Sequence, residues 1–99
     1  MKIVKNKNGS TLVVSLSGRL DTVSAPQLDK ELKEAIGDIS ELILDLSGLE
    51  YMSSAGLRIL LSAQKAMNNQ GKMIVKNVNN TIMEIFEVTG FIDILTIEN

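Results

Sequence analysis

Stretches with helical periodicity alternate with short apolar runs along this chain, and that alternation constrains its fold more than any other feature. The run at 41–46 (ELILDL) is nearly continuous in apolar residues, as expected of a central strand covered on both faces. The stretch 22–37 places Ala25, Leu28 and Leu32 on one helical face. Strands that alternate with helices require a largely parallel sheet joined by crossover helices. The sequence therefore predicts an α/β fold.

The remaining elements complete a predicted order of ββαβαβαβ. Asn8 and Gly9 tolerate positive φ, so 1–6 and 11–20 are expected to form an antiparallel hairpin. Helices are expected at 54–69 and 80–90, a strand at 71–78, and a strand or extended segment at 91–97. With 99 residues, the chain fits one domain, 1–99, with a mixed, mostly parallel β-sheet and about three crossover helices.

Composition excludes several functions. The chain has no cysteine and no histidine, so it lacks the thiolate, the commonest general base and the commonest metal ligand. A net charge of −2 with interspersed signs predicts no nucleic-acid partner. The N-terminus has no apolar stretch of a secretory signal, and no segment approaches a membrane span. We expect a cytoplasmic, non-enzymatic protein without metal, cofactor or membrane association.

The segment 50–61 (EYMSSAGLRILL) interrupts an apolar run with two serines and a glycine at a predicted helix start. Serine is a favoured N-cap residue, so Ser53 and Ser54 could both be capping residues, with Ser53 the preferred N-cap. In the same way Ser24 and Gln27 suggest a capping box for the helix at 22–37. Gly56 is costly in a first helical turn, so either a tight internal contact or the close approach of another chain must favour it.

Parallel strands bring their carboxyl ends to one edge of a sheet, where α/β proteins usually keep their sites. Asp21, Asp45 and the two serines could share that edge. The aspartates could hold Mg²⁺, although carboxylates beside helix starts are more often caps. A catalytic serine is disfavoured because no histidine is present and the segment does not match G-x-S-x-G.

Residues 42–61 (LILDLSGLEYMSSAGLRILL) resemble the signature of the STAS domain, specifically of the bacterial anti-sigma factor antagonists. The likeness extends to 14–28 (VSLSGRLDTVSAPQL) and to 86–95 (FEVTGFIDIL). The resemblance implies a protein that binds an anti-sigma factor, which is also a serine kinase of the histidine-kinase ATPase superfamily, and so releases a sigma factor. Phosphorylation by the kinase would end binding, and a PP2C-like phosphatase would restore it.

In the family, the phosphoacceptor lies two residues before the motif glycine. That glycine is Gly56 here, so the register selects Ser54, with Ser53 as a second candidate. This chain departs from the family by having Ser53 where aspartate is usual. The resemblance also suggests a partner-binding surface. Helix capping, exposure to solvent and core packing are the alternative roles for the same residues. The candidates for this surface are Asp21, Thr22, Met52, Ser53, Ser54, Gly56, Leu57 and Arg58. The rival function for the same fold is a scaffold or a regulatory subunit of a transporter, such as a lipid transporter, without a phosphorylation switch.

Overall fold

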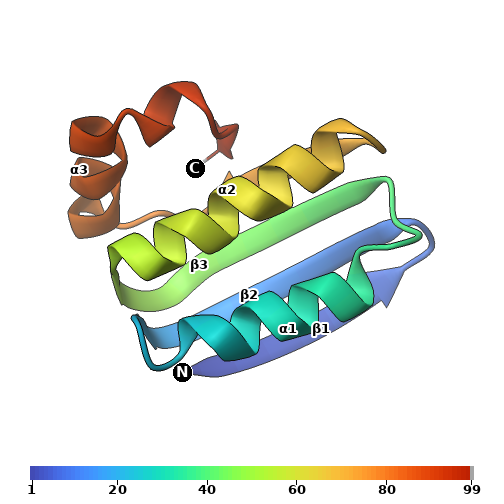
Figure 1. Ribbon diagram of the computed structural model, residues 1–99, viewed down its shortest axis with the longest axis horizontal. Helices are drawn as coiled ribbons and strands as arrows, with labels where there is room; N and C mark the ends of the chain where they lie inside the picture. Colours follow the sequence, from blue (N-terminus) through green and yellow to red (C-terminus); the bar gives the residue numbers. More distant parts are fainter. Residues whose placement is uncertain (99) are drawn as a thin grey trace.

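Strands and helices follow one another in the predicted order in a computed structural model that describes residues 1–98 (Figure 1). The elements are β1 (Lys2–Asn8), β2 (Thr11–Leu20), α1 (Ala25–Ala35), β3 (Glu41–Met52), α2 (Ser54–Asn68), β4 (Lys72–Lys76), α3 (Asn80–Thr89), a 3-10 turn (Phe91–Asp93) and β5 (Ile97–Glu98). The α/β fold class and the order ββαβαβαβ are confirmed.

The strands form one mixed sheet in the order β1-β2-β3-β4-β5. β1 and β2 pair antiparallel, as predicted, around a turn in which Gly9 has φ +64°. Every later pairing is parallel, so β2, β3 and β4 run in the same direction. Their carboxyl ends therefore point to the same end of the molecule, where α1, α2 and α3 begin.

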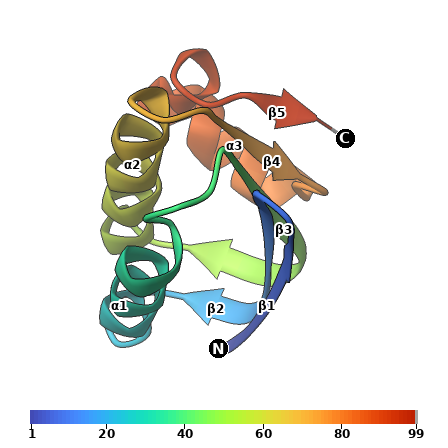
Figure 2. The ribbon, with the colours of Figure 1, turned by 90° about the vertical axis from the view of Figure 1, so that its right-hand side faces the viewer.

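Helices α1 and α2 pack side by side on one face of the sheet (Figure 2). Leu42, Leu44 and Leu46 point into that interface and are fully buried. The alternate residue Ile43 is only half-buried, because no helix among residues 1–98 covers the other face of β3. The expectation that this strand is covered on both faces was therefore wrong: its apolar run reflects one buried face and a moderately apolar open face.

β3 continues past the apolar run to Met52, and its pairing with β2 shifts twice on the way. The first shift lies between Ser15 and Ser17, where Gly48 packs against β2 so closely that a Cβ on it would lie 2.7 Å from the Ser17 Cβ. The second lies just before Arg19. These irregularities keep Leu49 and Met52 buried and bring β2 and β3 to a common end.

The C-terminal segment is less extended than its sequence suggests. Gly90, with φ +79°, ends α3, and Phe91–Asp93 form a 3-10 turn instead of a strand. Only Ile97 and Glu98 pair with β4, opposite Val75 and Lys76. Leu95 is nevertheless buried, so the segment closes the core by packing more than by strand pairing.

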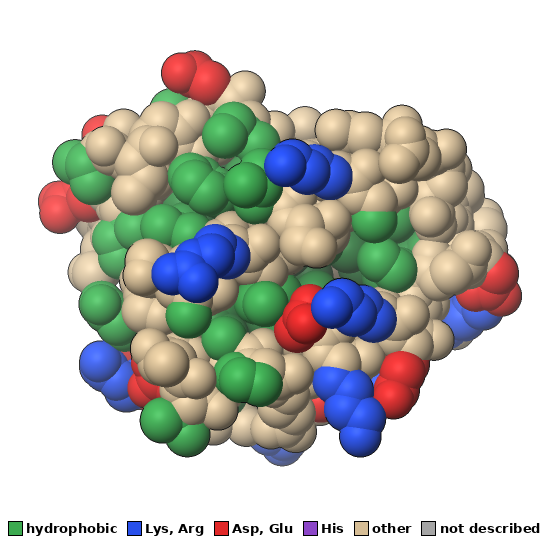
Figure 3. Space-filling view, viewed as in Figure 1, with side chains coloured by type: hydrophobic (Ala, Val, Ile, Leu, Met, Phe, Trp, Pro, Cys, Tyr) green, Lys and Arg blue, Asp and Glu red, His purple; other side chains and the backbone are tan. Residues whose placement is uncertain are grey.

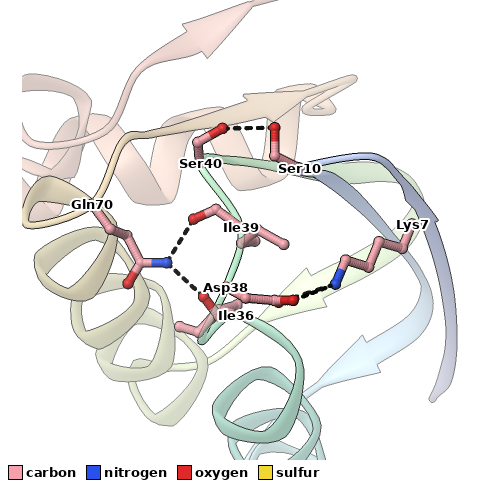
Figure 4. A network of polar contacts seen from close by, with 7 residues as sticks. All are labelled: Lys7, Ser10, Ile36, Asp38, Ile39, Ser40 and Gln70. Atoms are coloured by element: carbon pink, nitrogen blue, oxygen red, sulfur yellow. Dashed lines mark hydrogen bonds and ion pairs between the residues drawn. The ribbon is translucent and has the colours of Figure 1, made fainter.

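The end of the sheet opposite the starts of the helices is fixed by polar contacts (Figure 4). The Gln70 Nε2 donates to the carbonyl oxygens of Ile36 at 2.5 Å and Ile39 at 2.7 Å. Nearby, Lys7 pairs with Asp38 at 2.8 Å. These contacts tie the end of α2 and the hairpin to the loop between α1 and β3.

None of the helices in residues 1–98 is both long and apolar enough to span a bilayer.

Candidate functional site

The candidate site lies where β2 and β3 end and where α1 and α2 begin, at the left of Figure 1. Leu20 and Met52, the last residues of the two strands, are partners in the parallel register. The Ser53 N–H then donates to the Leu20 carbonyl at 2.8 Å, which fixes the first residue after β3 beside the first residue after β2. Asp21 and the two serines therefore share one edge of the sheet, as the order of elements predicted.

Asp45 does not belong to this edge. It lies in the middle of β3, opposite Ser15 and Lys76, on the face of the sheet that α1 and α2 leave open. Its carboxylate accepts from the Asn77 Nδ2 at 2.9 Å and from the Ser47 N–H at 3.0 Å. The hydrogen bond from Asn77 is the main cause that lowers the pKa of Asp45. The expected grouping of Asp21 with Asp45 was wrong, because β3 runs on well beyond Asp45 before it ends.

Ser54 is the first residue of α2 and its side chain is exposed. Ser53 precedes it at the N-cap position in extended conformation. The Ser53 side chain makes no capping hydrogen bond, and its Oγ is buried without any partner among the residues that the structure describes. Ser53 thus occupies the predicted cap position without making the predicted contact. Ser54 is therefore open to solvent, whereas the Ser53 hydroxyl is not.

Asp21 organises the turn that leads into α1. Its Oδ1 accepts from the backbone N–H groups of Val23 at 3.0 Å and Ser24 at 3.1 Å. The hydrogen bond from the Ser24 N–H is the largest cause that lowers the pKa of Asp21, and the positive charge of Arg19 adds to it. A carboxylate with a lowered pKa is a poor general base, so Asp21 is suited to hold a turn and not to activate a serine.

Ser24 does not form the predicted capping box with Gln27. Its Oγ donates to the Arg19 carbonyl at 2.8 Å and accepts from the Asp21 N–H at 3.0 Å. The Gln27 side chain donates instead to Glu31, one turn along α1, at 3.2 Å. The capping-box prediction was wrong, because the Ser24 hydroxyl is used to close the β2–α1 turn on itself.

Three of the predicted contact residues lie beneath the surface. Met52 is 1% exposed, Leu57 is 6% exposed, and Gly56 is buried between them. A Cβ on Gly56 would lie 2.8 Å from the Met52 Cγ, so the helix sits directly on the sheet at this point. These residues therefore support the site from inside and leave its surface to the exposed residues around them.

A shallow groove of about 350 Å³ lies between the starts of α1 and α2. Its lining residues are Thr22, Ala25, Pro26, Asp29, Ala55, Arg58 and Ile59. Thr22 belongs to the β2–α1 turn and Arg58 follows Ser54 by one helical turn. Figure 3 shows hydrophobic side chains gathered mainly on the left of this face, over α3 and the segment that follows it as well as around the first half of α2, whereas the right-hand end of the face carries few of them.

Val23 is an exposed apolar residue near the site that was not predicted from the sequence. It is 89% exposed at the tip of the β2–α1 turn, directly after Thr22. An apolar residue just before an N-cap often staples to the fourth helical residue, here Leu28, but Leu28 is fully buried and Val23 points into solvent. The sequence did contain a signal for this exposure, because Val23 is an apolar residue that lies in a turn and outside the apolar face of the helix.

The arrangement can present a hydroxyl at a helix N-terminus next to an apolar groove. Among residues 1–98, no group of three or more acidic side chains is placed to hold a metal ion. The four free N–H groups of a helix start and the helix dipole favour an anion there, such as a phosphate carried by Ser54. The site therefore suits binding and covalent modification.

Residues 2–99 match the STAS domain family, and the chain belongs to that family. Its relatives include anti-sigma factor antagonists. BtrV of Bordetella bronchiseptica, which is assigned as one, is 34% identical over 100% of this chain and 87% of its own length. The anti-sigma-B factor antagonist of Bacillus subtilis is 28% identical over 92% of this chain and 84% of its own. An anti-sigma factor antagonist from Mycobacterium paratuberculosis has a similar solved structure, with a TM-score of 0.88 and 25% identity over 97% of this chain and 83% of that one.

Proposed function

We propose that this chain is a single-domain, cytoplasmic antagonist of an anti-sigma factor, which it binds to release a sigma factor. Its partner is an anti-sigma factor of the serine kinase type, with a histidine-kinase-like ATPase fold. The relatives named above support this role, because they carry the name of anti-sigma factor antagonist and match 92% or more of this chain. On this proposal the chain is the substrate of an enzyme and is not itself one.

The observation that carries the proposal is the different access of the two serines. Ser54 is exposed at the start of α2 and stands two residues before Gly56, whereas the Ser53 Oγ is buried. A kinase can reach only a hydroxyl that is open to solvent, so Ser54 is the proposed acceptor and Ser53 is not. Its Oγ attacks the γ-phosphorus of ATP and forms the new O–P bond. The bond to ADP breaks, and the hydroxyl proton passes to a base of the kinase.

Phosphorylation at Ser54 acts through charge and leaves the fold intact. The modification adds about −1.5 to −2 charges at pH 7. At a helix N-terminus such a charge is favourable by about 0.3–1 kcal/mol, so the phosphoprotein stays folded. In a complex, the phosphate would lose water against the partner's surface. A loss of about 3 kcal/mol there weakens binding roughly a hundredfold. A PP2C-like phosphatase then restores the binding form.

The proposed contact surface consists of the exposed residues Thr22, Ser54 and Arg58, with Asp21 holding the turn beneath them. Met52, Ser53, Gly56 and Leu57 position this surface from inside. A regulatory subunit of a transporter, the rival function for this fold, does not require an open hydroxyl at this place.

Two measurements test the proposal. The purified chain is incubated with ATP and candidate anti-sigma factor kinases from the same organism, and mass spectrometry locates the phosphate. We expect modification of the wild type and of Ser53→Ala, and none of Ser54→Ala. Modification confined to Ser53 would overturn the choice of acceptor. Affinity capture from the source organism should recover an anti-sigma factor, and recovery of a transporter ATPase instead would favour the rival role.

A further inference from the structure

Arg58 carries a positive charge that the fold does not use. Its side chain is exposed on the wall of the groove, and it has no ion pair or hydrogen bond with any residue in 1–98. Asp29 lines the same groove, but its carboxylate is paired with Lys33 at 2.9 Å, one turn along α1. In a chain of net charge −2, this leaves an unpaired cation beside the apolar residues Ala55 and Ile59 of the groove.

Arg58 also stands at the right spacing to reach Ser54. Residues four apart on a helix have Cβ atoms about 5–6 Å apart. Helical side chains lean toward the N-terminus, so the turn on which Ser54 lies is within reach of the guanidinium of Arg58. An anion that precedes a cation by four residues is the favourable orientation of such a pair. A phosphate on Ser54 offers three acceptor oxygens to the planar fork of donors on arginine.

We propose that Arg58 serves both states of the switch. While Ser54 is free, the guanidinium binds an acidic side chain of the partner beside the apolar wall of the groove. Once Ser54 is phosphorylated, the guanidinium turns back and pairs with the phosphate on its own helix. This inference rests on the proposed function for the identity of the partner, and it adds to it the residue that links modification to loss of binding.

The consequence is that phosphorylation changes the groove twice. It adds a negative charge at the start of α2, and it withdraws the cation that an acidic partner segment needs. On this proposal the backbone keeps its place, so the apolar lining residues Pro26, Ala55 and Ile59 are unchanged. An acidic and apolar segment of the anti-sigma factor would then meet a groove of the wrong charge.

The intramolecular pair can be tested without any partner. The full chain is prepared with phosphoserine incorporated at position 54 during translation, and the phosphate is titrated by ³¹P NMR. A paired guanidinium lowers the pKa of the phosphate, so Arg58→Gln should move the titration midpoint up by about half a pH unit. Arg58→Lys keeps the charge without the planar fork and should lie between the two.

Lys65→Gln is the matched control, since Lys65 is an exposed cation on α2 about three turns beyond Ser54. It removes the same charge and should leave the midpoint unchanged. Asp21, Asp29 and Lys33 are present in every variant, so their charges cancel from the comparison. Equal midpoints in wild type and Arg58→Gln, or equal shifts in Arg58→Gln and Lys65→Gln, would overturn the intramolecular pair.

A binding measurement tests the second part of the proposal, that Arg58 binds the partner while Ser54 is unmodified. With unphosphorylated protein and the anti-sigma factor, Arg58→Gln should raise Kd about 5- to 30-fold, while Lys65→Gln leaves it unchanged. Unchanged affinity in Arg58→Gln would overturn the proposed role toward the partner. If no anti-sigma factor binds the wild type, the proposed function fails, and the ³¹P titration still decides the intramolecular pair.

Discussion

Gly56 and Leu20 are so close that a Cβ on the glycine would lie 2.7 Å from the Leu20 Cγ. Real Cβ atoms do not approach carbon to that distance, so the first turn of α2 sits on the end of β2 only because Gly56 has no side chain. Of the two explanations that the sequence left open for this glycine, the tight contact inside the domain is therefore sufficient. The same contact positions the first turn of α2, which begins with the exposed Ser54.

Gly56→Ala should destabilise the protein. Overpacking a core contact costs about 1–3 kcal/mol, and the better helix propensity of alanine offsets up to about 1 kcal/mol of it. We expect a net loss of about 1–2 kcal/mol in the free energy of unfolding, measured by urea denaturation. Gly37→Ala is the control, because a Cβ on Gly37 meets nothing within 4 Å. Equal effects of the two substitutions would show that packing against Leu20 is not what requires Gly56.

Ser53→Ala should change stability by less than about 0.5 kcal/mol, although Ser53 occupies an N-cap position. Its Oγ is buried and makes no hydrogen bond, so its removal breaks no contact. Asn79 offers the contrast at the start of α3. Its Oδ1 accepts from the Ile82 N–H at 2.8 Å, and its Nδ2 donates to the Leu49 carbonyl at 2.9 Å. Asn79→Ala should cost about 1–2 kcal/mol in the same denaturation experiment. A larger loss in Ser53→Ala than in Asn79→Ala would mean that Ser53 does cap α2 in solution.

Ser54→Asp should remove binding to the anti-sigma factor while the protein stays folded. A carboxylate at the first residue of α2 meets the positive end of the helix dipole, so the free energy of unfolding should stay constant or rise by about 0.3–1 kcal/mol. Binding should weaken roughly a hundredfold, measured by calorimetry. Ser62→Asp makes the same change at an exposed position two turns further along α2 and should bind normally. A sharp drop in the melting temperature of Ser54→Asp would show that charge at this place acts through unfolding.

Stability should be nearly constant from about pH 5 to 8, because the chain has no histidine, and should fall in acid. The Ser24 N–H is the main cause that holds the pKa of Asp21 below 3.8 in the folded protein. A carboxyl whose pKa is depressed by folding stabilises the fold above its unfolded pKa. That contribution is lost as the pH falls below about 4 and through the folded value. Asp21→Asn keeps the acceptor at every pH, so the difference between urea midpoints at pH 7 and pH 3 should shrink. An unchanged difference would remove Asp21 from the groups that cause acid unfolding.

The fold could be predicted because the hydrophobic periodicity of each helix and strand, and their order along the chain, are visible in the sequence. The alternation around Leu28 and Leu32 predicted α1, and the parallel order then placed Asp21 and Ser54 at one edge. The register shifts in β3 could not be predicted, since they depend on how Gly48 packs against a distant strand. Asp45 is absent from the site for a simpler reason: it lies in the middle of β3, which runs on to Met52 before it ends.

The contacts of the serine hydroxyls were the second feature that could not be predicted from the sequence. Ser24, Ser53 and Ser54 have the same chemistry and all stand at helix starts, yet one closes a turn, one is buried without a partner and one is exposed. The partners of Ser24 are Arg19 and Asp21, only a few residues away, whereas Ser53 is placed by a backbone hydrogen bond to Leu20, far away in the chain. The register to Gly56 predicts Ser54 as the acceptor, and the packing of the fold distinguishes its exposed position from the buried hydroxyl of Ser53.

Val23→Thr should weaken binding to the anti-sigma factor by about 5- to 30-fold and leave stability unchanged. Val23 is 89% exposed in the β2–α1 turn, directly after Thr22 of the groove, so it contributes nothing to the core, and burial of its methyl groups by a partner is worth about 1–2 kcal/mol. Val4→Thr is the matched control, because Val4 is 48% exposed on the face of the sheet that α1 and α2 do not cover. Calorimetry with the anti-sigma factor compares the two. An effect of Val4→Thr equal to that of Val23→Thr would place the partner elsewhere, because only a partner seated between the starts of α1 and α2 discriminates between these two valines.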